Sequence, residues 1–248
     1  MKKITASQAF SRGWEIFKQN ALQHIGVFFL VIIISSFFNT KLNPQYNMIF
    51  KGEGMHASFN HGHISPFWFI LYFIVQIIIT LFITGYALDN VRGKYNGIGS
   101  VFSKYITGKL MLNVFIYSIL ISLVATILLA PGLLILLAGK GGGSIWLLIG
   151  LLLFLYIIFR LFFVNYLIVD GYDFADALKI SWQKTRPYIG EIILFIIIGS
   201  FIIFLGFLAL IVGVLVAIPV FYLAQAVFYN EAVSEPAEQT PATEALEQ

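Results

Sequence analysis

Arg160 is the residue of this chain best placed to do chemistry, because it is the only charged residue between positions 145 and 169. An arginine at the centre of a membrane helix costs about 2.5 kcal/mol or more, so it is expected to be paired, hydrated or extended toward lipid phosphate. Asp170 lies ten residues further on, a helical distance of about 15 Å. If Asp170 marks the membrane surface, Arg160 is predicted to lie near mid-membrane.

Four other polar residues are predicted to lie toward the inner ends of the apolar segments: Glu191, Asn113, Asn165 and Gln225. Glu191 is the only acidic residue within a predicted span that is positioned to approach Arg160. Two interpretations stay open. The polar residues line a cavity that opens to the cytoplasm and holds a substrate or an ion, or they form hydrogen bonds between helices while the arginine reaches a lipid phosphate.

A second group of possible ligands lies in the loop before the second apolar segment: Glu53, His56, His61 and His63. His61 and His63 can converge in an extended chain, and imidazole is a common zinc ligand. The loop is rich in glycine, asparagine and serine, however, and shows no ordered scaffold, so no metal site is predicted there.

Other chemistry is not indicated. The chain has no cysteine, which excludes disulfides, thiol catalysis and thiolate metal sites. The apolar segments hold no paired carboxylates and no nucleophile beside a base, and their polar groups show no arrangement of acid, base and oxyanion hole. The sequence therefore predicts a protein that is not an enzyme and uses no cofactor.

The elements that carry these residues are predicted to be membrane helices. Hydrophobic residues make up 59% of the 248 residues and charged residues 11%, whereas about a quarter of a typical soluble domain is charged. Mean hydropathy is +0.90. Four segments are long enough to cross a hydrocarbon core of about 30 Å, namely 21–39, 66–88, 110–137, interrupted by Pro131-Gly132, and 145–169.

A fifth apolar segment, 188–229, is too long for one crossing. Its 42 residues would measure about 63 Å as one helix, twice the thickness of the hydrocarbon core. It is predicted to fold back as a hairpin with a turn near Gly206. The fold class is therefore an all-α polytopic membrane bundle of six transmembrane helices, forming a single domain over residues 1–230.

Lysine and arginine fall unevenly on the two sides of these helices. Eleven lie on one side: Lys2, Lys3, Arg12, Lys18, Arg92, Lys94, Lys104, Lys109, Lys179, Lys184 and Arg186. Three lie on the other: Lys41, Lys51 and Lys140. Because cytoplasmic loops are enriched in these residues, both termini are predicted to be cytoplasmic. The pI near 9.0 then reflects orientation and contact with anionic lipids, and no nucleic-acid partner is predicted.

The two ends of the chain are predicted to differ. Arg12, Glu15 and Lys18 interrupt the N-terminal segment, and no cleavage pattern follows it, so no removable signal peptide is expected. Residues 231–248 carry five glutamates, two prolines and no lysine or arginine. We expect this segment to be a disordered, acidic, cytoplasmic tail.

An internal repeat indicates how the helices are organised. A shift of 168 residues aligns Thr5 with Asp173 and Trp14 with Trp182, and both segments begin with a helix N-cap pattern before a span. Aromatic residues recur at helical spacing in the two segments: Phe10, Trp14 and Phe17 in the first, Phe174 and Trp182 in the second. They are predicted to anchor amphipathic helices at the inner interface, aromatic side toward lipid. With a weaker third copy from Ser100, the plan is three units, each an interfacial helix and a two-helix hairpin.

The C-terminal half carries a resemblance to a known family. It contains Arg160-Leu-Phe-Phe-Val-Asn-Tyr-Leu-Ile-Val-Asp170, then Ala177-Leu-Lys-Ile-Ser-Trp182, Pro219 and Ala224-Gln-Ala-Val-Phe-Tyr229. These segments resemble a large group of uncharacterised six-helix bacterial membrane proteins, related to the membrane domain fused to some glycerophosphodiester phosphodiesterases. Ala9-Phe10, Gly13-Trp14 and Phe17-Lys18 are similar to that family's N-terminal interfacial helix. The resemblance implies a bacterial cytoplasmic-membrane protein; it supplies no catalytic residues, and the chain lacks a phosphodiesterase domain.

Two classes of function remain. The first, which we favour, is a non-catalytic scaffold or accessory factor whose contacts are membrane lipids or another membrane protein. The second is a small transporter or exporter component, with an ATPase as a possible partner. The repeat, Pro131, Pro219 and Arg160 are the arguments for the second class.

Overall fold

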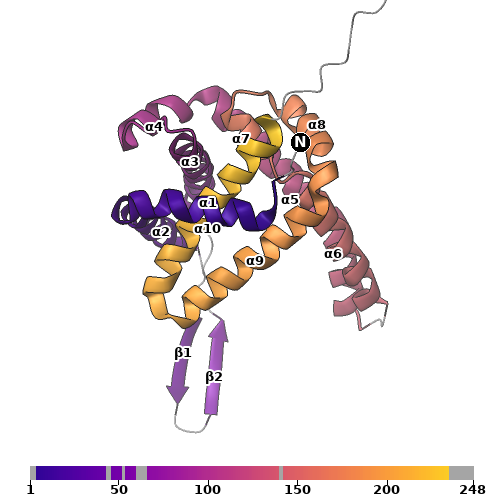
Figure 1. Cartoon of the computed structure of the whole chain (residues 1–248). Helices are drawn as coiled ribbons and strands as arrows, with labels where there is room; N and C mark the ends of the chain where they lie inside the picture. Colours follow the sequence, from indigo (N-terminus) through magenta and orange to yellow (C-terminus); the bar gives the residue numbers. More distant parts are fainter. Residues whose placement is uncertain (1–3, 43–45, 52–53, 60–65, 140–141, 235–248) are drawn as a thin grey trace, which may run out of the picture.

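The computed structural model describes residues 4–42, 46–51, 54–59, 66–139 and 142–234. Its elements, in chain order, are α1 (Ala6–Gln19), α2 (Ala21–Leu42), β1 (Tyr46–Lys51), β2 (Gly54–Phe59), α3 (Pro66–Val91), α4 (Ile98–Tyr105), α5 (Gly108–Leu137), α6 (Gly143–Arg160), α7 (Val164–Val169), α8 (Phe174–Thr185), the 3-10 helix η1 (Arg186–Tyr188), α9 (Ile189–Leu208) and α10 (Leu210–Ser234) (Figure 1). Within these described ranges, six helical stretches are long and apolar enough to cross a membrane. The predicted helical membrane bundle is confirmed.

The helices form three units, each a short helix followed by a two-helix hairpin (Figure 1). The first unit is α1 to α3, the second α4 to α7, and the third α8 to α10. The two arms of each hairpin pack against each other. This order of elements is the one that the internal repeat predicts, although the third copy begins at Ile98, two residues before the predicted start.

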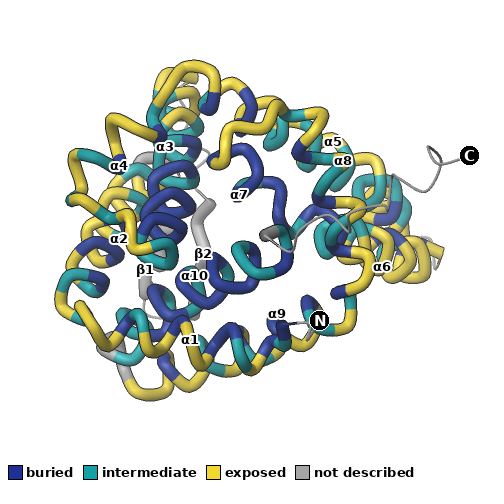
Figure 2. The backbone as a smooth tube through the Cα atoms, turned by 45° about the horizontal axis from the view of Figure 1, so that its top comes forward, coloured by how far each residue is buried: buried dark blue, intermediate teal, exposed yellow. Residues whose placement is uncertain are grey.

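Each short helix packs on the last helix of the preceding unit, and the series closes into a ring. Helix α4 packs on α3, α8 on α6 and α7, and α1 on α10. We call α1, α4 and α8 the rim helices. Figure 2 shows α7 and the C-terminal parts of α3 and α10 as the buried centre of the bundle, with the rim helices around them. The repeat therefore builds a closed arrangement in which every unit contributes one central helix.

Matching residues of the repeat take matching places in this arrangement. Thr5 caps α1, since its hydroxyl accepts a hydrogen bond from the backbone N–H of Gln8 and the Gln8 side chain accepts one from the Thr5 N–H. Asp173 is the N-cap residue of α8, but its side chain makes no cap bond. Ala9 and Ala177 are both fully buried, facing the bundle.

The large aromatic side chains of the rim divide between core and surface. Phe10 and Phe17 are buried in the protein core, whereas Trp14 is exposed. The prediction that the whole aromatic stripe of α1 faces lipid is therefore wrong for the two phenylalanines. Phe10 stacks on Phe195 of α9 with ring centroids 4.5 Å apart. Both lipid and protein core favour apolar side chains, so amphipathic spacing alone does not distinguish them.

Two of the hairpins differ from prediction, the second at Pro131 and the third at its turn. Helix α5 continues through Pro131, so the predicted interruption is wrong. A proline removes one donor, here the N–H that would bond to the Ile127 carbonyl, and membrane helices tolerate such a loss. Near it, Trp146 of α6 donates its indole N–H to the Leu128 carbonyl at 3.1 Å, which joins the two arms of the hairpin. Gly132 permits close packing instead, because a Cβ there would lie 2.8 Å from the Trp146 and Leu147 side chains.

The turn of the last hairpin lies at Ala209, three residues after the predicted Gly206. Gly206 is still helical, and it faces Gly213 of α10 so closely that a Cβ on Gly206 would lie 2.8 Å from the Gly213 carbonyl oxygen. This glycine pair lets the two arms approach before the chain turns.

Regular structure occurs in two segments, one predicted to lack an ordered scaffold and one predicted to be disordered. The loop between α2 and α3 includes an antiparallel hairpin in which β1 pairs with β2, with Tyr46 opposite Phe59. Helix α10 extends to Ser234, four residues into the predicted tail, and Glu231 there forms an ion pair with Arg12 of α1. Residues 235–248 lie outside the described residues, so disorder of the remaining tail stays a prediction.

Candidate functional site

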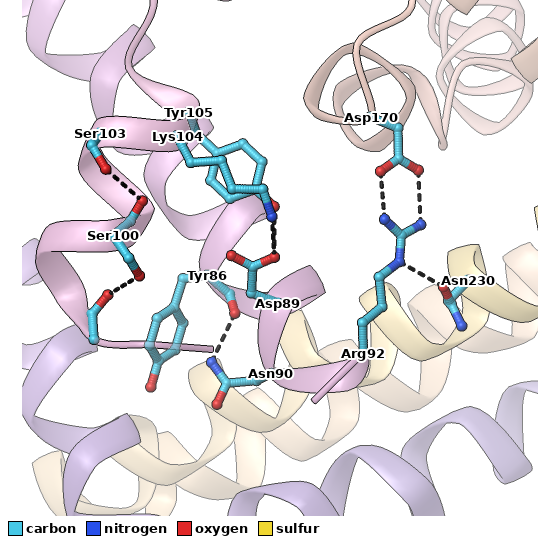
Figure 3. A network of polar contacts seen from close by, with 11 residues as sticks. Tyr86, Asp89, Asn90, Arg92, Ser100, Ser103, Lys104, Tyr105, Asp170 and Asn230 are labelled. Atoms are coloured by element: carbon cyan, nitrogen blue, oxygen red, sulfur yellow. Dashed lines mark hydrogen bonds and ion pairs between the residues drawn. The ribbon is translucent and has the colours of Figure 1, made fainter. Parts of the chain in front are cut away.

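The central helices are joined at one end by a polar cluster around Arg92 and Asp170. Arg92 directly follows α3, and its guanidinium donates to both carboxylate oxygens of Asp170, at the end of α7, at 2.6 and 2.8 Å (Figure 3). Its Nε donates to Asn230 of α10 at 2.9 Å, and the Tyr229 hydroxyl donates to Asp170 at 2.6 Å. We call these four residues the central ion-pair cluster; it connects all three units.

The chemistry of this cluster is structural. A bidentate arginine–carboxylate pair is short and geometrically specific. The hydrogen bonds to Asp170 raise the pKa of Arg92 above its ordinary value, so the arginine stays charged. A small polar cavity of about 310 Å³ adjoins the pair, lined by Arg92, Asp170, Gly171 and Tyr172. Sequence reasoning missed this cluster, because it used Arg92 only to judge orientation and Asp170 only to estimate the depth of Arg160. The available signal was that both residues directly follow the last helix of a unit.

A second polar contact joins α4 to α3. Lys104 and Tyr105 both donate to the same oxygen of Asp89, each at 2.7 Å (Figure 3). Burial raises the pKa of Tyr105 to about 12, so its hydroxyl remains a donor. The Tyr105 ring lies over Gly85, where a Cβ would come within 2.2 Å of it.

Arg160 lies at a break in the fourth span. Helix α6 ends at Arg160 and α7 begins at Val164, whereas one continuous helix was expected. Such a break leaves backbone groups without partners, which is tolerated at membrane depth only inside protein or a cavity. Two hydroxyls of α8 supply the partners. Ser181 and Thr185 each donate to the Arg160 carbonyl at 3.0 Å, and Ser181 accepts from the Phe163 N–H at 3.3 Å.

The Arg160 side chain is 4% exposed and lies against Trp182 of α8, with its guanidinium carbon 4.5 Å from the ring centroid. Its Nε has no hydrogen-bond partner among the described residues. The predicted approach of Glu191 is not seen, because the Glu191 carboxylate accepts a hydrogen bond from the Ala6 N–H of α1 at 2.8 Å. Because the helix ends at Arg160 and α8 covers this end, the distance argument for a mid-membrane arginine does not hold.

The other predicted polar residues lie on three helices. Asn113 is buried on α5, while Asn165 on α7 and Gln225 on α10 are half-buried. Asn113 Nδ2 and Asn165 Oδ1 lack partners within the described ranges, as Arg160 Nε does. The structure thus places Asn113, Arg160 and Asn165 on one hairpin. Glu191 contacts the start of α1 instead.

The histidines give no further site that can be described. Glu53, His61 and His63 lie outside the described residues, and nothing is described of the His56 side chain. His24 is buried, and its Nδ1 lies 2.6 Å from the Tyr86 hydroxyl. In the part of the chain that the structure describes, no three histidine or acidic side chains gather as metal ligands.

An apolar groove runs between α1, α9 and α10. Its volume is about 470 Å³, and its lining includes Phe10 and Trp14 of α1, Ile202 of α9 and Val216 of α10. Comparison of the chain with protein-family models, with curated proteins and with solved structures finds no match. The resemblance to six-helix bacterial membrane proteins therefore stays a prediction, and function must be argued from the geometry.

Proposed function

We propose that this is a non-catalytic protein of the bacterial cytoplasmic membrane that contacts lipids through its rim helices and serves as a scaffold or accessory factor for a membrane partner. The observation that carries the proposal is the matched exposure of two tryptophans. Trp14 and Trp182 occupy equivalent positions of α1 and α8, and each is 42% exposed. The opposite faces of these helices are buried on the bundle. Tryptophan is most stable at the membrane interface, where the ring meets apolar chains and the indole N–H meets water.

Three further features support lipid contact. The remaining rim helix, α4, exposes Ile98 and Phe102. The groove beside Trp14 is almost entirely apolar and has the character of a site for an acyl chain. Lys184 lies in the last turn of the rim helix α8, where its charge suits anionic headgroups.

A second candidate is a small transporter or exporter component. Both candidates have cytoplasmic termini. The unpaired polar atoms of Asn113, Arg160 and Asn165 favour it, because buried polar groups often mark ion or substrate pathways. Transport also requires water to reach the central helices from each side in turn. The fully buried apolar side chains of Leu81, Leu167 and Leu223 on these helices argue for the first candidate.

Depth-dependent fluorescence quenching tests the proposed lipid contact. In variants that keep only Trp14 or only Trp182 of the four tryptophans, lipids brominated near the headgroup should quench more strongly than lipids brominated near the chain ends. A tryptophan placed at Leu152, an exposed position in the middle of α6, is the matched deep control and should show the reverse order. Equal or stronger quenching of Trp14 and Trp182 by the deep label would refute interfacial placement.

A further inference from the structure

The charge of Arg160 has no protein counter-ion in the described part of the chain. Six of the seven acidic residues there have another partner: Glu15 with Lys18, Asp89 with Lys104, Asp170 with Arg92, Asp173 with Lys109, Glu231 with Arg12, and Glu191 with the Ala6 N–H. The seventh, Asp176, is exposed in the first turn of α8. A buried cation without a counter-ion is costly, so an anion from outside the protein is expected beside it.

The break after α6 places the Arg160 guanidinium close to the surface of the protein, where an anion can approach it. The turn 161–163 ends α6 under α8, and Trp182 covers one face of the guanidinium. Cation–π contact leaves the N–H groups at the edge of the plane free to donate. Since Trp182 is itself partly exposed, the arginine lies directly beneath a surface of the rim and not in the centre of the bundle.

The hairpin that carries Arg160 also holds two asparagines that each have an unpaired buried atom, Asn113 on α5 and Asn165 on α7. Helix α7 packs on α5. The unpaired Nε of Arg160 is an N–H donor, as an anion requires.

We propose that Arg160 and Trp182 form a binding site for a phosphate group, supplied by the headgroup of a phospholipid in the inner leaflet. Arginine suits phosphate because its planar fork donates two parallel hydrogen bonds. This site rests on the proposed lipid contact and makes it specific for a phosphate.

Native mass spectrometry of the detergent-solubilised chain tests the site. Three probes separate the sources of binding: phosphatidylglycerol, diacylglycerol with the same chains, and inorganic phosphate. The wild type should retain phosphatidylglycerol in preference to diacylglycerol. Arg160→Leu should weaken that retention about tenfold or more, because it removes charge-assisted hydrogen bonds. Arg160→Lys keeps the charge but not the fork and should give an intermediate loss.

Arg186→Leu is the matched control, since it removes an exposed cation from the segment that follows α8, and it should retain the lipid like the wild type. Binding of inorganic phosphate that is lost in Arg160→Leu also supports the site, with a free anion as the source. Retention of phosphatidylglycerol by Arg160→Leu and Arg160→Lys at the wild-type level would overturn it, as would equal retention of diacylglycerol by the wild type. If Trp14 and Trp182 still lie at headgroup depth, the proposed lipid contact stands without this site.

Discussion

Asp170→Leu should lower the free energy of unfolding by about 2 to 4 kcal/mol, because it leaves the partly buried Arg92 without its counter-ion and Tyr229 without an acceptor. The change removes the bond between α3 and α7, and the bond from α10 to the same carboxylate. Both bonds are lost together because the same Asp170 carboxylate accepts hydrogen bonds from the first unit and from the third unit. Thermal unfolding in lipid nanodiscs, or chemical unfolding in mixed micelles, measures the loss.

Asp173→Leu is the control for this prediction. Asp173 pairs with Lys109, but both side chains are about two-thirds exposed, so the pair should contribute less than about 1 kcal/mol. The double variant Arg92→Leu with Asp170→Leu should be more stable than Asp170→Leu alone, since no unpaired charge remains. Equal losses for Asp170→Leu and Asp173→Leu would show that the central ion-pair cluster does not hold the units together.

Gly13→Leu should detach α1 from α10. The ideal Cβ at Gly13 would lie 2.7 Å from the backbone nitrogen and 2.8 Å from the Cα of Ala224, and backbone atoms cannot move aside as a flexible side chain can. Overpacking of this kind costs about 1 to 3 kcal/mol or more. The ring of three units opens where the first and last units meet, so we expect a large effect on assembly as well as on stability.

A thiol crosslink reports this detachment directly. Arg12 of α1 and Glu231 of α10 meet at the tips of their side chains, and the chain has no cysteine of its own. Cysteines at these two positions should therefore be joined by a bifunctional thiol reagent long enough to replace the two side chains. Gly13→Leu should abolish most of the crosslink. Gly99→Leu should preserve it, because nothing lies within 4 Å of a Cβ at Gly99 in the rim helix α4. An undiminished crosslink in Gly13→Leu would mean that α1 does not depend on close approach.

The membrane helices and the repeat were predictable from the sequence because their signals are local. A long apolar run dictates a span, and the pairs Thr5 with Asp173 and Trp14 with Trp182 show the repeat directly. The break after Arg160 was not predictable in this way. Residues 161–163 are as apolar as their neighbours, and the hydroxyls that satisfy the broken helix come from Ser181 and Thr185, some twenty residues later.

The candidate site was predicted only in part for the same reason. Arg160 and Asn113 stand out as polar residues in apolar segments, and both are buried in the structure. The pairing of each acidic residue depends on which helices are neighbours. Glu191 bonds to α1, which precedes it by 185 residues, and Arg92 bonds to a carboxylate 78 residues away. Only the closed ring of units brings these groups together.

Two-sided labelling of single cysteines is the measurement that most directly tests whether the protein works at its rim or through an internal pathway. Cysteines at Leu81 of α3 and Ala217 of α10, both buried in the bundle, should resist a membrane-impermeant thiol reagent applied from either side. A cysteine at Lys179, exposed on α8, should react from the cytoplasmic side only. Reaction of Leu81→Cys and Ala217→Cys from both sides would reveal a water-filled pathway through the central helices, and the protein would then be a transporter and not a lipid-contacting scaffold.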